Sequence, residues 1–397
     1  MSRLILSPAR EKSLLRLHPW IFSGAVGEVI DNPKIGETVE VFDSKGNFLA
    51  HAAYSPNSQI RARVWSFDEN EKIDKNFLAQ RLRRCLESRR AMGFEPNAAN
   101  AFRFANAEND FLPGCIIDYY AGYLSVQLLS AGWEIFRAVL VECLTEIFPD
   151  CKGIIERSDS EVRIKEGLET QIKILAGDVP KEAIIIEENG LKILVDLHKG
   201  HKTGYYLDQR NARKRIGELA KDKRVLNCFC YTGGFGLSAA RGGAKSVRQV
   251  DASASALELA EQNAALNNLS SIDYVEADVF TYLRKCRDRG ETFDLLILDP
   301  PKFAESASQV EKAAKGYKDI NLLAIKLLAP GGMLATFSCS GHISPELFQK
   351  IVADAAVDAK RPVQILENFR QAPDHPVLSS FPEGMYLKGL LAVEGLD

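Results

Sequence analysis

From about residue 190 onward, the sequence alternates regularly between segments typical of β-strands and segments typical of helices. The strands are predicted at residues 225–229, 246–250, 272–275, 293–298 and 333–337. The helices are predicted between them, at about 234–242, 254–267, 279–288 and 317–329. Alternation of this kind predicts an α/β fold with a parallel sheet covered by helices on both faces. Because such sheets bind ligands at the carboxyl ends of their strands, the residues that follow each strand are the candidates for function.

A glycine-rich loop follows the first predicted strand. It reads Asn227-Cys228-Phe229-Cys230-Tyr231-Thr232-Gly233-Gly234-Phe235-Gly236. Glycines at such a turn let the backbone pass close to a ligand and open the next helix. A nicotinamide site would need the spacing G-x-G-x-x-G directly after the strand, and this loop matches that spacing poorly. Since many turns of this kind bind nothing, the loop by itself identifies no ligand.

Acidic residues stand at the ends of the next three predicted strands. Asp251 ends the second strand, where a carboxylate can accept hydrogen bonds from both hydroxyls of a ribose. Asp278 follows the third strand, where it can accept from an adenine amino group. Asp299 follows the fourth strand and begins the run Asp299-Pro300-Pro301-Lys302-Phe303. A glycine loop, two acids and Asp-Pro-Pro on four successive strands predict a methyltransferase that uses S-adenosylmethionine.

Several motifs of this chain occur together in one enzyme family. They are the loop and the Asp-Pro-Pro run above, together with residues 10–15, 18–25, 201–210, 316–321 and 337–341. These motifs resemble those of class I RNA methyltransferases, above all the bacterial cytosine-5 methyltransferases of 23S ribosomal RNA, and the resemblance covers nearly the whole chain. It implies a class I Rossmann-like methyltransferase domain, S-adenosylmethionine as the cofactor, and 23S ribosomal RNA or a precursor of the large ribosomal subunit as the partner. Residues 107–114 and 187–191 depart from the family pattern, which leaves details of the middle of the chain open.

The resemblance also implies which residues hold the cofactor. Part of the segment 201–210, just before the first strand, is expected to line the methionine end of S-adenosylmethionine, although the same residues could equally begin a helix with ordinary packing. With the loop and the acids, the predicted cofactor-binding residues are Tyr206, Gln209, Asn227, Phe229, Tyr231, Thr232, Gly233, Gly234, Asp251, Asp278 and Asp299.

Cys339 lies in Phe337-Ser338-Cys339-Ser340-Gly341, directly after the fifth predicted strand. Carbon 5 of cytosine is a poor nucleophile, so its methylation needs a thiolate that first adds to carbon 6. We predict that Cys339 is this nucleophile and that Asp299 hydrogen-bonds the edge of the base. A buried cysteine that packs as a small hydrophobe is the competing interpretation. The neighbouring Asp-Pro-Pro strand and the family resemblance favour the nucleophile.

Three residues after Asp299 are predicted to contact the substrate: Pro300, Pro301 and Lys302. Many cytosine-5 RNA methyltransferases carry a second cysteine after the first proline of this motif. Here that position is Pro301, which leaves Cys339 as the candidate nucleophile. The base that removes the proton from carbon 5 is not identified by the sequence; Asp299 and a water molecule are the candidates.

The chain is long enough for two or three domains. Residues 1–70 contain short apolar runs separated by Gly and Asn turns, which predict a small β-rich domain. The family resemblance implies that it is a PUA-like RNA-binding domain. Residues 71–180 are predicted to form a middle α+β domain, with helices at 72–92 and about 133–147, a strand pair near 153–165 and a linker at 177–180. Residues 181–397 are then the methyltransferase domain.

Basic residues in the first ninety positions are candidates for phosphate contacts. Arg61 and Arg63 alternate with apolar residues and are predicted to share one exposed strand face. Residues 81–90 read RLRRCLESRR and contain five arginines. A solvated helix face is the plainer interpretation for any single one of these arginines. The formal net charge of −3 neither supports nor excludes an RNA substrate.

The eight cysteines are scattered along a chain that shows neither a signal peptide nor an apolar run that could span a bilayer. This pattern predicts reduced thiols in the cytoplasm and no structural metal site.

Two alternatives to a cytosine-5 methyltransferase stay open: an N-methyltransferase that acts on a purine of ribosomal RNA without covalent catalysis, and an inactive RNA-binding assembly factor. The oligomeric state is also open, with a homodimer as one option.

Overall fold

The computed structural model describes residues 2–395, which form two compact units. Unit 1 consists of Met1–Ile186, Val195–Leu207 and Pro373–Gly384. Unit 2 consists of Glu187–Leu194, Asp208–Ala372 and Met385–Asp397. No helix within residues 2–395 is long and apolar enough to cross a membrane.

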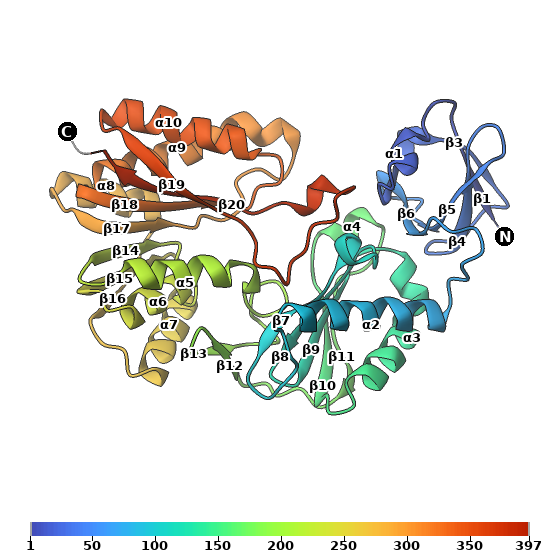
Figure 1. The fold of residues 1–397 in the computed structure, drawn as a ribbon, viewed down its shortest axis with the longest axis horizontal. Helices are drawn as coiled ribbons and strands as arrows, with labels where there is room; N and C mark the ends of the chain where they lie inside the picture. The colour runs from blue at the N-terminus through green and yellow to red at the C-terminus, as the bar shows by residue number, and fades with distance from the viewer. Residues whose placement is uncertain (1, 396–397) are drawn as a thin grey trace. The chain divides into compact units, whose positions relative to one another are not determined.

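Unit 2 is built on a seven-stranded sheet with the order β16-β15-β14-β17-β18-β20-β19 (Figure 1). Its strands are β14 (Arg224–Cys228), β15 (Ser246–Asp251), β16 (Ile272–Glu276), β17 (Phe293–Leu298), β18 (Leu328–Ser338), β19 (Val363–Phe369) and β20 (Lys388–Glu394). The first five in chain order pair in parallel, as predicted, and β20 pairs antiparallel with both β18 and β19. The strand order reverses at β14, between β15 and β17, which is where open α/β sheets bind their ligands.

Helices cover both faces of this sheet (Figure 1). They are α5 (Arg210–Leu219), α6 (Gly234–Arg241), α7 (Ala254–Leu266), α8 (Val279–Asp288), α9 (Val310–Lys326) and α10 (Pro345–Ala359). Alternate residues of β17 point to opposite faces: Leu296 packs in the core formed with α8, α9 and α10, and Leu295 packs in the core formed with α5 and α6. Burial on both faces explains why these strands are continuous apolar runs.

Unit 1 contains two sheets. The first has the order β2-β6-β5-β4-β1-β3, and the second has the order β11-β10-β9-β8-β7. The strands of the first are β1 (Arg3–Leu6), β2 (Trp20–Phe22), β3 (Val26–Ile30), β4 (Thr38–Phe42), β5 (Phe48–Tyr54) and β6 (Ile60–Ser66), with the short helix α1 (Lys12–Leu15). Those of the second are β7 (Ala101–Asn106), β8 (Cys115–Tyr120), β9 (Tyr123–Leu128), β10 (Gly153–Ser158) and β11 (Gln171–Gly177).

The two sheets of unit 1 share part of a core. Helices α2 (Lys75–Ala91) and α3 (Gly132–Ile147) pack on the second sheet, close to their predicted positions. Trp65 of β6 stands edge-on to Trp133 of α3, with ring centroids 5.2 Å apart. The predicted boundary at residue 70 therefore falls inside a continuously packed unit, and the three predicted domain ranges stay predictions.

The strand pair predicted near 153–165 is partly wrong. β10 pairs antiparallel with β11, whereas Val162–Lys165 forms the short helix α4. Arg163 explains the difference: its buried guanidinium donates to the carbonyl of Leu128 at 2.5 Å and to Glu134 at 2.9 Å. These bonds hold the segment as a helical turn at the end of β9, and β11, the next apolar run, pairs with β10 instead.

A two-stranded hairpin, β12 (Ile184–Glu188) and β13 (Leu191–Val195), precedes the large sheet. Its turn is Asn189-Gly190, and both residues have positive φ, at 52° and 75°. Two such residues give the turn that matches the twist of paired strands. The departure from the family motif at residues 187–191 is therefore compatible with an ordinary tight hairpin.

Candidate functional site

The glycine-rich loop joins β14 to α6 by an unusual backbone path. Phe229, Tyr231 and Gly233 all have positive φ, at 58°, 49° and 84°. A Cβ atom on Gly233 would lie 2.7 Å from Nε2 of Gln249, and one on Gly236 would lie 2.5 Å from its Cδ. The glycines are thus required by close packing on β15 as well as by the backbone conformation.

Asp251 ties the end of β15 to this loop. Its Oδ2 accepts from the backbone N–H of Tyr231 at 2.8 Å, and its Oδ1 accepts from that of Ser253 at 3.0 Å. The carboxylate is only partly buried, and each of its oxygens can accept more than one hydrogen bond. The structure therefore brings the predicted ribose-binding acid and the predicted loop together.

Asp278 has a structural role that the sequence analysis missed. It is the N-cap of α8, and its Oδ1 accepts from the backbone N–H of Thr281 at 2.9 Å and from the hydroxyl of Thr281 at 2.7 Å. These two bonds lower the pKa of the Asp278 carboxyl. An Asp directly before a predicted helix is a usual N-cap signal and would have revealed this role. The side chain is exposed at the end of β16, so a contact with a ligand stays compatible with the capping bond.

Gln209 connects the segment before the sheet to the Asp-Pro-Pro run. It is buried at the end of the 3₁₀-helix Leu207–Gln209, and its Nε2 donates to Oδ2 of Asp299 at 2.7 Å. The backbone N–H of Asp299 in turn donates to the carbonyl of Cys228 at 3.4 Å. Two residues predicted from separate motifs therefore meet at the carboxyl edge of the sheet, beside the glycine-rich loop.

Three buried polar atoms in or next to the loop have no hydrogen-bond partner within residues 2–395. They are Oε1 of Gln209, Oδ1 of Asn227 and Oγ1 of Thr232. An unsatisfied buried polar atom costs about 1–3 kcal/mol unless a water molecule or a ligand supplies its partner. All three residues were predicted to bind the cofactor, and this arrangement fits a polar group such as S-adenosylmethionine.

The loop that carries Cys339 is hydrogen-bonded to the loop that follows Asp-Pro-Pro. The Ser340 hydroxyl accepts from the backbone N–H groups of Phe303 and Ala304, each at 3.2 Å. The same hydroxyl is bonded to the Tyr317 hydroxyl at 3.0 Å, and the Ser338 hydroxyl donates to that of Tyr317 at 2.9 Å. Both serines that flank Cys339 are thus fixed by one buried tyrosine of α9.

Tyr317 was not predicted as a site residue, although its motif was noted. It is fully buried, its ring lies 4.6 Å from that of Phe303, and burial raises the pKa of its hydroxyl. Its neighbours in sequence are Gly316 and Lys318, and nothing in this run signals that the hydroxyl will face a loop. Only the packing of α9 against the sheet reveals that Tyr317 supports the cysteine loop.

All eight cysteines lie in the described part of the chain, and none of them forms a disulfide. Six of them are buried, whereas Cys339 and Cys151 are partly exposed. Burial raises the pKa of the Cys228 and Cys230 thiols in the glycine-rich loop, so both pack as neutral side chains, and it raises the pKa of the Cys151 thiol as well. Cys339 therefore combines partial exposure with a position at the carboxyl edge of the sheet.

Comparison with known proteins identifies the family. A profile of S-adenosylmethionine-dependent methyltransferases matches residues 165–385, and a profile of PUA-like domains matches residues 4–67. The chain is 53% identical over 389 residues to Ribosomal RNA large subunit methyltransferase I from Klebsiella pneumoniae (strain 342), with 98% of this chain and 97% of that protein covered. It is 54% identical over 389 residues to the protein of the same name from Erwinia tasmaniensis, with 98% of each covered. The chain belongs to the ribosomal RNA large subunit methyltransferase I family.

Solved structures show the same fold. A candidate S-adenosylmethionine-dependent methyltransferase from Streptococcus mutans has a TM-score of 0.85 at 23% identity, with 99% of this chain and 100% of that chain covered. The structure of SMU.776, a candidate methyltransferase in complex with SAH, has a TM-score of 0.86 with the same identity and coverage. Family membership confirms the predicted fold class, the PUA-like N-terminal domain and the cofactor, S-adenosylmethionine.

Within this family member, Tyr206 lies in unit 1, where its hydroxyl is 3.2 Å from Nδ1 of His201 and its ring carries the Lys202 ammonium at 4.3 Å. The cofactor contact expected of Tyr206 stays a prediction.

The three residues that follow Asp299 differ in exposure: Pro300 is buried, whereas Pro301 and Lys302 are exposed. The latter two are therefore accessible to a substrate.

The prediction that Arg63 lies on an exposed face is wrong. Its side chain is only 6% exposed and pairs with Glu108 at 3.4 Å and with Glu166 at 2.7 Å. The middle part of unit 1 supplies both carboxylates and covers this face of β6, so Arg63 holds the unit together. Arg61 is partly exposed, and its guanidinium donates to the carbonyl of Pro56.

The basic helix α2 divides its arginines between two faces. Arg89 is fully buried, donates to the carbonyl of Arg103 at 2.8 Å and pairs with Asp110. Arg83 and Arg84 are exposed. The phosphate contacts predicted for residues 81–90 are thus limited by burial to the outer face of the helix.

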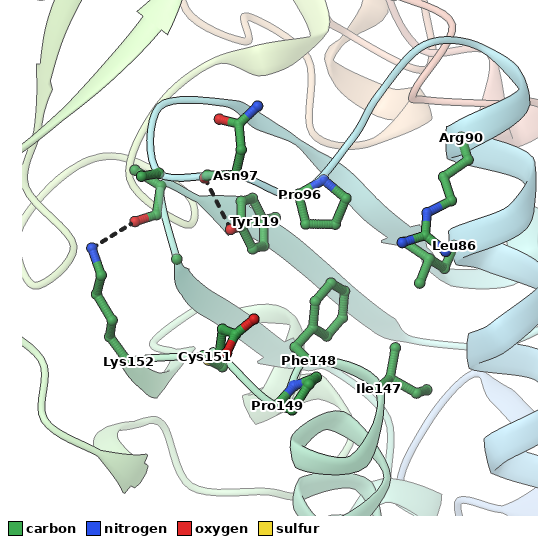
Figure 2. Close-up of a pocket in the computed structure, with 14 residues that line it drawn as sticks. Leu86, Arg90, Pro96, Asn97, Tyr119, Ile147, Phe148, Pro149, Cys151 and Lys152 are labelled. Atoms are coloured by element: carbon green, nitrogen blue, oxygen red, sulfur yellow. Dashed lines mark hydrogen bonds between the residues drawn. The ribbon is translucent and has the colours of Figure 1, made fainter.

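Unit 1 also contains a cavity of about 570 Å³ beside the loop that precedes β10 (Figure 2). The Tyr119 hydroxyl donates to the carbonyl of Asn97 at 3.0 Å there, and the Lys152 ammonium donates to that of Ala121 at 3.3 Å. Arg90, one of the arginines considered for phosphate contacts, lines it, but none of the predicted catalytic or cofactor-binding residues does. We assign no part of the reaction to this cavity.

Proposed function

We propose that this protein methylates carbon 5 of a cytosine in 23S ribosomal RNA, with Cys339 as the covalent nucleophile. The observation that carries the proposal is the position of Cys339. It is partly exposed in a loop that Ser340 bonds directly to the residues after Asp-Pro-Pro. The relatives that match nearly the whole chain are named ribosomal RNA large subunit methyltransferases, which supports ribosomal RNA of the large subunit as the substrate.

The chemistry requires a nucleophile at this place. The target cytosine leaves its stack and enters the site, because an enzyme cannot reach the base edge inside a duplex. The Cys339 thiolate adds to carbon 6, and the electron pair of the 5,6 double bond makes carbon 5 nucleophilic. S-adenosylmethionine supplies the electrophilic methyl group when it is bound. A base then removes the proton from carbon 5, the 5,6 double bond re-forms, and the Cys339 thiolate leaves.

Asp299 is proposed to act on the base while Cys339 acts on carbon 6. When the Asp299 carboxyl group carries a proton, it donates to N3 of the cytosine and stabilises the negative charge that develops there during the addition; when it is ionised, it accepts from the amino group of the base. The Gln209 amide, which donates to Oδ2 of Asp299 at 2.7 Å, fixes the orientation of this carboxylate. Asp299 or a water molecule takes the proton from carbon 5.

The proposed cofactor-binding residues are those predicted from the sequence, with Asp251 for the ribose and Asp278 for the adenine. Pro300, Pro301 and Lys302 are proposed to line the substrate side of the site, and Lys302 is exposed and charged. Arg61, Arg83 and Arg84 are proposed to contact phosphates of the RNA. Arg63 is left out because its guanidinium is buried against two carboxylates.

The test compares Cys339→Ala with Cys151→Ala, which removes the other partly exposed thiol. Large-subunit ribosomal RNA from cells that lack this protein is incubated with S-adenosylmethionine and each variant, and nucleosides are analysed by mass spectrometry. We expect 5-methylcytosine with the wild type and with Cys151→Ala, and a loss of at least a thousandfold with Cys339→Ala, since removal of a covalent nucleophile has effects of this order.

RNA that carries 5-fluorocytosine provides a second test, because the fluorine at carbon 5 cannot leave as a proton and the Cys339 adduct accumulates. Full activity of Cys339→Ala would refute the covalent mechanism. A methyl group on an exocyclic nitrogen of a purine would establish the N-methyltransferase instead. Absence of any methylated nucleoside with the wild type would favour the RNA-binding assembly factor.

A further inference from the structure

Lys388, the first residue of β20, is a buried charged group beside the cysteine loop. It is 6% exposed, and it is the register partner of Ser338 in the antiparallel β18–β20 pair. Its Nζ donates to the carbonyl of Ser340 at 2.6 Å and to the carbonyl of Ile343 at 2.7 Å. Both carbonyls belong to the turn that begins at Cys339, so one ammonium bridges two carbonyl groups of this turn.

A lysine is rarely buried, because its charge loses hydration. Here burial lowers the pKa of the Lys388 ammonium to about 8, the Cys339 thiolate acts in the opposite direction, and Lys302 adds to the lowering. Lys388 also lines a small cavity with Glu346 of α10 and Arg370 after β19. The other titratable groups at the turn are the Tyr317 hydroxyl, which contacts the two flanking serines, and the exposed imidazole of His342, which lies within the turn itself.

We propose that Lys388 is a positioning residue for Cys339: its buried ammonium holds the turn in place and stabilises the Cys339 thiolate over the thiol. The inference rests on the proposed function, in which that thiolate attacks carbon 6. Lys388 reaches the cysteine loop through two carbonyl bonds and is not required to touch the substrate.

The electrostatic effects of Lys388 and Cys339 on each other are reciprocal. If the negative charge on Cys339 favours the ammonium form of Lys388, the ammonium must favour the thiolate form of Cys339 by the same free energy. The ammonium of Lys302, which acts on Lys388, is exposed, so water screens its charge. Lys388 is buried, so its charge acts through a less polar medium.

The test measures the thiolate directly, without RNA and without S-adenosylmethionine. The full-length protein is alkylated with iodoacetamide between pH 5.5 and 10, and peptides that contain Cys339 and Cys151 are quantified by mass spectrometry. The variants are Lys388→Met, which removes the charge and both donors, and Lys388→Arg, which keeps a charge at every pH used. Lys350→Met on the exposed side of α10 is the matched control.

In Lys388→Met we expect the pH midpoint for alkylation of Cys339 to rise by about one unit or more, which slows alkylation at pH 7 roughly tenfold. Cys151 in the same molecules, Lys350→Met and Lys388→Arg should show no such shift. A purely structural role of Lys388 would change the folding of the variant but would leave the midpoint where it is. An unshifted Cys339 midpoint in folded Lys388→Met overturns the proposal.

The wild-type protein gives a second measurement, which needs no folded variant. Its Cys339 should titrate below the pH of about 8.5 that is typical of a free cysteine, and a midpoint at or above that value also overturns the proposal. The two proposals can fail separately. Full methylation by Cys339→Ala refutes the covalent mechanism and leaves the alkylation profile interpretable, whereas an inactive Cys339→Ala with an unshifted Lys388→Met profile refutes the role of Lys388 alone.

Discussion

Ser340 joins the loop that carries Cys339 to the loop that follows Asp299, and its replacement by alanine tests the architecture of the proposed site. The hydroxyl is fully buried and accepts from the N–H groups of Phe303 and Ala304, each at 3.2 Å, while it also contacts the Tyr317 hydroxyl at 3.0 Å. The Ser340→Ala change removes the hydroxyl group and leaves two backbone donors without their acceptor.

The expected magnitude follows from the burial of those donors. Ala304 is 0% exposed, so its N–H cannot turn to water, and an unsatisfied buried donor costs about 1–3 kcal/mol. Phe303 is partly exposed, so its N–H recovers part of the loss from solvent. We therefore expect a local loss of about 2 kcal/mol, which corresponds to hydrogen exchange about 30-fold faster at these two amides.

The assay is hydrogen–deuterium exchange, measured by mass spectrometry on peptides that contain Phe303 and Ala304. Peptides from β15 and β16 report whether unit 2 stays folded, and Ser308→Ala, a change at an exposed serine nearby, serves as the control. We expect methylation by Ser340→Ala to fall at least tenfold, because a small misplacement of reacting groups is costly. Exchange within threefold of the wild type in a folded variant would show that Ser340 does not hold the Asp-Pro-Pro loop.

Three further measurements test other parts of the molecule. Gly233→Ala places a Cβ 2.7 Å from a Gln249 nitrogen at a φ of 84°, so we expect a loss of about 1–3 kcal/mol of stability and weaker cofactor binding, measured by calorimetry; an unchanged melting temperature would contradict this. The double change Arg83→Gln and Arg84→Gln should reduce the salt dependence of RNA binding by about one to two units of slope, and an unchanged slope would exclude these phosphate contacts. Methylation by the wild type should decline as the pH rises past about 8, where the Lys388 ammonium loses its proton, and this limb should move to higher pH in Lys388→Arg; coincident profiles would speak against that assignment.

Much of the catalytic half could be predicted from local patterns. The five predicted strands occur as β14 to β18, and four of the predicted helices occur as α6 to α9. Strands buried on both faces are continuous apolar runs, which the sequence displays without knowledge of any partner. Because consecutive parallel strands end at the same edge, the same patterns also predicted that Asp251, Asp299 and Cys339 lie there.

The antiparallel edge of the sheet was not predicted. β19 and β20 follow α10 in the chain. β20 inserts between β18 and β19, so it pairs with a strand that is distant in sequence as well as with its neighbour in sequence. Nothing in the apolar run 388–394 specifies which strand it pairs with, since pairing is decided by the partner's exposed edge. For this reason Lys388 carried no sequence signal, although it is buried beside Cys339.

The sequence by itself determined where the strands β14 to β18 and the helices between them form and which residues stand at the ends of those strands, because hydrophobic periodicity and turn residues act over a few positions. Only the tertiary structure decided which side chains are buried and what they meet. Arg63 has the alternation of an exposed strand residue, yet carboxylates 45 and 103 residues further along the chain, Glu108 and Glu166, enclose it. Ser340 and Lys388 act through groups from distant segments in the same way. Whether a side chain is buried depends on which distant part of the chain packs over it. A local sequence pattern shows which face of a strand a residue lies on, but it does not show what packs against that face.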